Sequence, residues 1–127
     1  MSSVVKNIVL VHGAFADGSS WSKVIPLLQE LDYKAVAVQN PMTSLADEVA
    51  FTKRIIALQD GPVILVGHSW GGAVITQAGD DPKVAALVYV TAYARQKWSN
   101  PQTMQAATAF AGGSDLLFTI CDLPFII

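Results

Sequence analysis

The stretch Val63–Gly72, VILVGHSWGG, places a serine where a strand gives way to a helix. Its first half is short, apolar and β-branched, which is typical of a buried strand. Gly67, Ser69 and Gly71 form a Gly-x-Ser-x-Gly pattern, and the small residues after it are predicted to begin a helix. In this setting the pattern predicts a strained turn that displays one hydroxyl at the strand tip. We therefore interpret Ser69 as a nucleophile.

Strands and helices alternate on both sides of this turn. Strands are predicted at Val4–Val11, Tyr33–Gln39, Val63–Gly67 and Val84–Val90. Helices are predicted from about Ser20 to Leu31, from Ser44 to about Gln59, and over the residues that follow Ser69. The apolar face of the first helix is predicted to comprise five residues at spacings of three and four, Trp21, Val24, Ile25, Leu28 and Leu31. This alternation indicates an α/β fold, with a mostly parallel sheet and flanking helices.

The composition narrows the class of protein. The chain has 127 residues, enough for one domain, of which 52% are hydrophobic and 14% charged. The low fraction of charged residues and the high fraction of hydrophobic ones predict strands covered on both faces, or a core face that this chain does not cover alone. With a net charge of −2 and no basic block, we expect no nucleic-acid partner and no membrane partner. The single cysteine, Cys121, and the lack of a secretory signal favour the cytoplasm.

Two distant segments together predict an oxyanion hole. The residue after the nucleophile, Trp70, supplies one main-chain N–H group. The second is expected from the loop after the first strand, where HGAF offers Ala14 as the first candidate and Phe15 as the second. Gly13 lets that loop turn tightly. Phosphate binding, the rival interpretation of a glycine-rich turn, is disfavoured because Ser69 stands where a dinucleotide motif needs glycine and no Walker lysine follows.

The segments IVLVHGAFADGSSW, VILVGHSWGGAVI and VAALVYVTAYA resemble the N-terminal half of an α/β-hydrolase. The likeness is to the small esterase and hydroxynitrile-lyase-like branch, whose oxyanion loop also reads His-Gly-Ala, and it covers roughly residues 4–94. The resemblance implies that Ser69 attacks the acyl carbon of a small ester-like substrate, with Trp70 and Ala14 as oxyanion donors. It implies no cofactor and no metal. Relatives with this architecture also hydrolyse other bonds, so the fold alone does not fix the reaction.

A general base is missing from the expected place. The order on this fold is serine, acid, histidine, yet the only histidines are His12 and His68, both before Ser69. Alternation at the strand end predicts that His68 packs under the turn. His12 ends the first strand and is expected near Ser69, where it could act as the general base. The resemblance favours another task for His12, that of bracing the oxyanion loop. Among the acids, Asp60, Asp80 and Asp81 are expected at the opposite, amino edge of the sheet, and Asp17 is interpreted as a turn residue. The remaining candidates, Asp115 and Asp122, lie in the tail, whose fold the sequence does not predict.

The family-like pattern ends near Ala94. Residues 1–94 are predicted to form the hydrolase core of four strands and three helices, and residues 95–127 an atypical tail, partly disordered. We hypothesise a truncated α/β-hydrolase fold that lacks the acid and the histidine and has weak or no esterase activity. The alternative is a non-catalytic remnant that binds small esters or a partner. The fourth strand would then have an unpaired edge, which predicts self-association.

Overall fold

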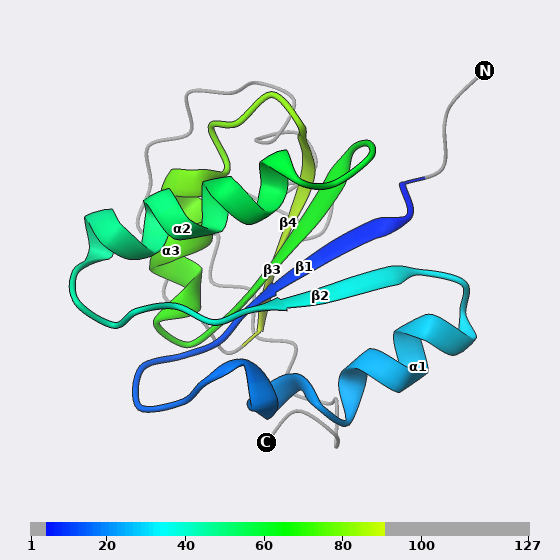
Figure 1. The fold of residues 1–127 in the computed structure, drawn as a ribbon, viewed down its shortest axis with the longest axis horizontal. Helices are drawn as coiled ribbons and strands as arrows, with labels where there is room; N and C mark the ends of the chain where they lie inside the picture. The colour runs from blue at the N-terminus through cyan, green and yellow to red at the C-terminus, as the bar shows by residue number, and fades with distance from the viewer. Residues whose placement is uncertain (1–4, 91–127) are drawn as a thin grey trace, which may run out of the picture.

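The computed structural model describes residues 5–90, which form a sheet with helices on both sides (Figure 1). The elements, in chain order, are β1 (Asn7–Val11), a 3-10 helix η1 (Gly18–Trp21), α1 (Val24–Glu30), β2 (Lys34–Val38), α2 (Leu45–Ala57), β3 (Val63–His68), α3 (Gly71–Ala78) and β4 (Val84–Val90). Every predicted strand and helix of this part of the chain is present. The predicted tail, residues 95–127, lies outside the described residues.

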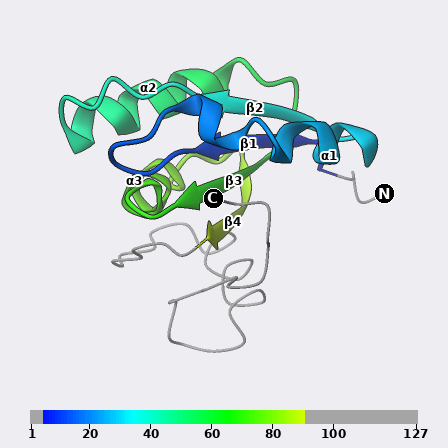
Figure 2. The same ribbon diagram turned by 90° about the horizontal axis from the view of Figure 1, so that it is seen from below.

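The sheet has the strand order β2-β1-β3-β4, and all three strand pairs are parallel, as predicted. Figure 2 shows the four strands side by side in this order. The register pairs Val11 with Gly67, and Gly67 with Tyr89. Because the strands end at one edge, the segments that follow them meet there. We call this edge, with residues 12–17, 39–43 and 69–70, the carboxyl rim.

The central strand β1 is buried along its whole length. Alternation sends Val9 and Val11 to the face covered by α2 and α3, and Ile8 and Leu10 to the face covered by α1 and η1. The first face is closed by Ile56, Val74, Ile75 and Ala78, and the second by Trp21 and Val24. This cover on both faces explains the high apolar content of the chain. It also holds β1 in place, so that the loop after β1 starts from a fixed point at the carboxyl rim.

The first helix begins later than predicted. The predicted start near Ser20 is wrong because Asp17 caps a separate 3-10 turn, and α1 begins only at Val24. Hydrogen bonds from the Ser19 hydroxyl and amide hold the pKa of Asp17 below its usual range. The prediction that Leu31 belongs to the buried face is also wrong. The helix ends at Glu30, and Leu31 turns outward with 67% of its surface exposed.

The second helix begins where the sequence predicts. Ser44 is its N-cap, and the Ser44 hydroxyl accepts the Asp47 amide at 3.0 Å. The Thr43 hydroxyl donates to the Asp47 carboxylate at 2.6 Å, which lowers the pKa of that carboxyl. The helix turns Glu48, Thr52 and Ile56 inward, where all three are buried. Two of these are polar, so the inward face of α2 contains more than core packing.

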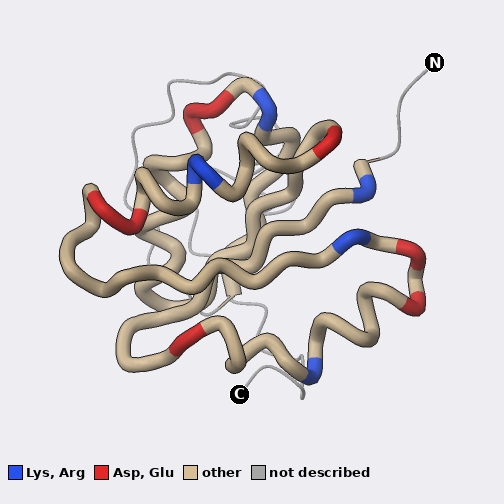
Figure 3. The backbone as a smooth tube through the Cα atoms, in the orientation of Figure 1, with Lys and Arg blue, Asp and Glu red and all other residues tan. Residues whose placement is uncertain are grey.

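Charged residues lie mainly around the outline of the described fold, with both signs present (Figure 3). Two ion pairs join exposed side chains, Lys34 with Asp60 at 2.7 Å and Lys6 with Asp32 at 3.5 Å. Exposed pairs of this kind stabilise a protein by about 0–1 kcal/mol, so the buried core dominates. Within residues 5–90, none of the helices has the length and apolarity needed to cross a bilayer.

Candidate active site

Ser69 occupies the turn between β3 and α3 in a strained conformation. Its φ is 52°, in the left-handed region that residues other than glycine seldom adopt. The turn is held by the Ser69 amide, which donates to the Val90 carbonyl at 3.3 Å, and by the Gly72 amide, which donates to the Ser69 carbonyl at 3.0 Å. Such strain costs about 1–3 kcal/mol and is concentrated at functional sites. The predicted sharp turn at Ser69 is therefore present.

The two glycines that flank Ser69 are sterically required. A methyl group on Gly67 would lie 2.6 Å from the Gly71 carbonyl oxygen. A methyl group on Gly71 would lie 2.4 Å from the Val11 carbonyl oxygen and 3.0 Å from that of His12. Both obstacles are backbone, so no side-chain rotation relieves the contact. The pattern thus lets α3 start directly against the end of β1.

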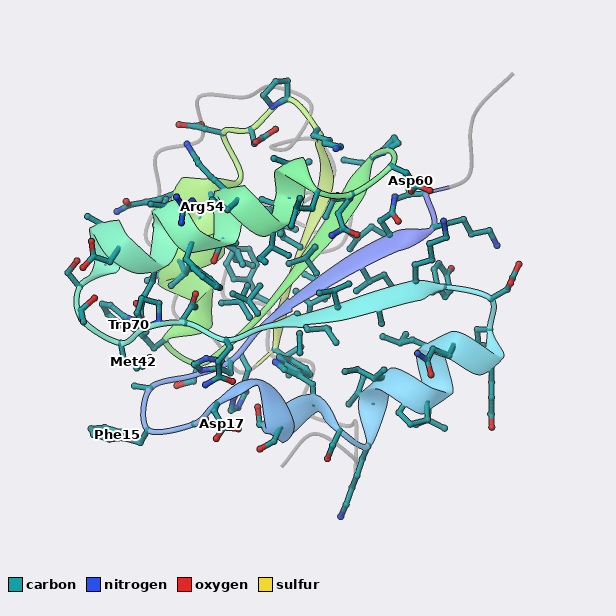
Figure 4. The ribbon with its side chains drawn as sticks, viewed as in Figure 1. Phe15, Asp17, Met42, Arg54, Asp60 and Trp70 are labelled. Carbon is teal, nitrogen blue, oxygen red and sulfur yellow. The ribbon has the colours of Figure 1, made fainter. Side chains whose placement is uncertain are left out.

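The loop after β1 lies against the serine. A methyl group on Gly13 would stand 3.1 Å from the Ser69 Cβ and 3.3 Å from the His68 carbonyl oxygen. Gly13 therefore brings the next residues, Ala14 and Phe15, to the carboxyl rim beside Ser69. Phe15 has a φ of 61°, and its side chain is fully exposed. Figure 4 shows Phe15, Met42 and Trp70 at this same end of the sheet.

Three main-chain N–H groups of the carboxyl rim bear on the predicted oxyanion hole. Across residues 5–90, the amides of Ala14, Phe15 and Trp70 have no hydrogen-bond acceptor. Ala14 follows the glycine that contacts Ser69, and Trp70 follows Ser69 itself. Two amides in such positions are what an oxyanion hole requires, because they stabilise the charge that develops when a serine attacks an acyl carbon. Phe15 is the alternative partner in the same loop.

His12 is buried under the loop, and both of its ring nitrogens are engaged. Nε2 accepts the Asn40 amide at 3.1 Å. Nε2 is therefore unprotonated, and Nδ1 donates to the Gly13 carbonyl at 2.9 Å. The side chain is only 1% exposed, so no proton acceptor faces the rim. This geometry suits a brace for the Gly13 turn and does not suit a general base.

His68 precedes Ser69, and a methyl group on Gly13 would stand 3.4 Å from its Nδ1. Its ring meets the edge of Trp21, with ring centroids 6.4 Å apart and planes at 86°. Burial lowers the pKa of His68 below its ordinary value, because it disfavours the charged ring. Within the described part of the chain, the Ser69 hydroxyl has no hydrogen bond to either histidine. Neither ring is placed to remove its proton.

The far end of the sheet holds Asp60, Asp80 and Asp81, whereas Asp17 and Glu48 lie at its carboxyl end. Figure 4 shows Asp60 opposite Trp70 and Phe15, and the Asp60 carboxylate accepts from the Lys34 ammonium at 2.7 Å. Asp80 and Asp81 follow the last turn of α3, at the same amino edge. No cluster of three or more His, Cys, Asp or Glu side chains that could hold a metal is found in residues 5–90.

Sequence analysis missed one polar contact to this site. The Trp70 indole N–H donates to the Glu48 Oε2 at 2.7 Å. Glu48 belongs to α2 and is only 2% exposed. A signal was present in the sequence, because Glu48 shares the helical spacing of Leu45 and Ile56. A charged residue is unexpected on that inward face of the helix. The pattern could not reveal which residue it meets.

Comparisons with known proteins agree with this arrangement. A profile of the alpha/beta hydrolase family matches residues 8–124. The match continues past Ala94, where sequence analysis placed the end of the resemblance. A pyrethroid hydrolase of Sphingobium wenxiniae is 33% identical over 112 residues, which cover 78% of this chain and 40% of that protein.

A plant protein and a solved structure are also similar. Methylesterase 2 of Arabidopsis thaliana is 31% identical over 104 residues, covering 69% of this chain and 40% of the plant protein. A crystal structure of a pyrethroid hydrolase superimposes with a TM-score of 0.65 at 31% identity, covering 70% of this chain and 41% of that one. The chain thus spans about 40% of the length of the curated relatives it matches.

Proposed function

Because this chain belongs to the alpha/beta hydrolase family, we propose that it contains the nucleophile and the oxyanion hole of a carboxylester hydrolase. In this proposal Ser69 attacks the acyl carbon of a small ester. The alcohol leaves, and an acyl-enzyme forms on the Ser69 oxygen. The amides of Trp70 and Ala14 stabilise the negative oxygen of the tetrahedral intermediate. The names of the relatives, a pyrethroid hydrolase and a methylesterase, favour an ester over other acyl bonds.

The observation that carries the proposal is the strained turn beside unpaired amides. Ser69 is held at a φ of 52°, and the glycines around it could not be replaced without moving backbone. A chain that used this turn only for packing would gain stability by relaxing it. Keeping the strain is understandable if the hydroxyl must be presented to a reactant. The non-catalytic alternative leaves this strain without a use.

We further propose that turnover by the 127-residue chain is slow, since its two histidines are not available as bases. In a serine hydrolase, removing the histidine lowers turnover by roughly a millionfold. Oxyanion stabilisation and binding still give on the order of a thousandfold to ten-thousandfold acceleration over water. Acylation is therefore expected to depend on hydroxide or on an added base, and to accelerate as the pH rises.

A fluorophosphonate probe tests this proposal, because it reacts with serines that have nucleophilic character. We expect slow, stoichiometric labelling that peptide mapping assigns to Ser69 and that added imidazole accelerates. Ser69→Ala should abolish the label, whereas Ser22→Ala, which changes an exposed serine, should leave the label in place. The absence of any label at Ser69 in the presence of imidazole would refute the proposal.

A further inference from the structure

Hydrogen bonds link one helix, α2, to both sides of the candidate oxyanion hole, directly at Trp70 and through Asn40 and His12 at Gly13. Glu48 of α2 accepts the indole N–H of Trp70 at 2.7 Å, on the side of the Ser69 turn. One helical turn later, the Thr52 hydroxyl lies 3.5 Å from the Asn40 Oδ1. Asn40 donates its amide to His12, which donates to the Gly13 carbonyl. The residues on either side of the expected oxyanion site are thus both connected to the inward face of α2.

The contact at Glu48 is costly for the fold. The side chain is 2% exposed, and its second oxygen, Oε1, has no hydrogen-bond partner within residues 5–90. A buried polar atom without a partner destabilises a protein, and an apolar side chain of similar length would pack at this position without that cost. Core packing therefore does not explain why a carboxylate stands here. Among the described residues, the one hydrogen bond of its side chain is to the Trp70 indole.

The position of Trp70 gives that contact a consequence. Trp70 is the N-cap of α3 and has no side-chain capping bond, so its own backbone is not fixed in that way. Its ring packs against the core, and its N–H is held by Glu48. Fixing the ring fixes the direction of the Trp70 amide, which immediately follows Ser69. A misplacement of about 1 Å at a reacting centre can slow a reaction by about a hundredfold.

The geometry points to Glu48 as a positioning residue for the oxyanion hole, acting through the Trp70 indole. This inference rests on the proposed function and adds a residue to it. Glu48 does not touch the substrate, and it exchanges no proton with Ser69. It holds the Trp70 side chain so that the Trp70 amide remains directed at the oxygen that becomes negative. The link through Thr52 and Asn40 supports the opposite wall from the same helix.

The test measures the rate at which a fluorophosphonate labels Ser69, in imidazole buffer, together with the stability of each variant. Glu48→Met removes the acceptor at similar length, Trp70→Phe removes the donor, and Glu48→Gln keeps an acceptor oxygen. We expect about a tenfold slower labelling for Glu48→Met and for Trp70→Phe. The double variant should be no slower than either single one, because both changes break one bond. Glu48→Gln should stay within about threefold of the unmodified chain.

Two controls separate positioning from stability. Ile56→Val shortens a fully buried side chain of the same helix and should lower the free energy of unfolding without slowing the labelling. Glu30→Gln changes an exposed carboxylate on α1 and should alter neither. If Glu48→Met does not fold, Trp70→Phe and Glu48→Gln test the same bond from its two ends.

The outcomes distinguish this inference from the proposed function. If the unmodified chain labels at Ser69 while Glu48→Met or Trp70→Phe labels equally fast, the positioning role is refuted and the proposed function stands. Additive slowing in the double variant, or slowing that follows the loss of stability in Ile56→Val, would also refute the positioning role. If the unmodified chain is not labelled at Ser69, the proposed function fails and the inference fails with it.

Discussion

Gly71→Ala is expected to destabilise the chain through a contact that the surrounding structure cannot avoid. The added methyl group would lie 2.4 Å from the Val11 carbonyl oxygen, and contacts under 3.0 Å essentially never occur. A shift of at least the 0.6 Å between these values is needed. β1 is hydrogen-bonded to strands on both sides, so α3 must move. Overpacking costs about 1–3 kcal/mol, and alanine returns up to about 1 kcal/mol of helix propensity. We expect a net loss of about 1–2 kcal/mol.

Urea unfolding followed by circular dichroism measures this loss. Gly61→Ala is the matched control, because its methyl group would meet only the Asn7 amide at 3.6 Å, an ordinary contact. The control should stay within about 0.5 kcal/mol of the unmodified chain. A Gly71→Ala variant as stable as the control would refute the reasoning, because it would show that α3 does not rest on the end of β1.

Three further predictions concern the pH response, the activity and the assembly of the chain. Because burial lowers the pKa of His68, nuclear magnetic resonance should show its ring titrating below about 6.5. Below about pH 6.5 the unfolded chain binds a proton at His68 that the folded chain does not yet bind. The free energy of unfolding should therefore fall as the pH drops from about 6.5 towards the folded pKa, and a titration above 6.5 would contradict this. Hydrolysis of a nitrophenyl ester should be slow and lost in Ser69→Ala, and a rapid turnover that survives Ser69→Ala would show that another group acts. Since β4 is an edge strand of the described sheet, size-exclusion chromatography should show self-association, and a clean monomer would count against it.

The sequence predicts the sheet well, because each strand is an apolar, β-branched run with clear ends. The strand Val84–Val90 has the bounds predicted for it, and the cap of α2 at Ser44 follows from a local motif. The turn at Ser69 is equally predictable, since only glycine fits at Gly67 and Gly71. In these places the residues that determine the local structure lie within a few positions of it in the sequence.

The beginning of α1 could not be read in the same way. Apolar spacing runs without a break from Trp21 to Leu31, yet a 3-10 turn capped by Asp17 contains Trp21, and the helix proper begins at Val24. At the other end the chain leaves the helix through Asp32, whose φ is 69°, to enter β2. Periodicity shows which residues are apolar, but it does not show where a turn redirects the chain.

Long-range polar contacts were the least predictable part of the site. The bond between Glu48 and Trp70 joins residues far apart in the sequence, and so does the bond between His12 and Asn40. Each depends on how α2 or the end of β2 packs over the rim, which local patterns do not encode. The proximity of Gly13 to Ser69 could be anticipated, because parallel neighbouring strands end at one edge.

The structure of the Ser69 phosphonate adduct would test the central claim most directly, since its phosphoryl oxygen occupies the place of the oxyanion. The account predicts that this oxygen lies within about 2.7–3.1 Å of the amide nitrogens of both Trp70 and Ala14. A phosphoryl oxygen directed into solvent, with neither amide in reach, would contradict it.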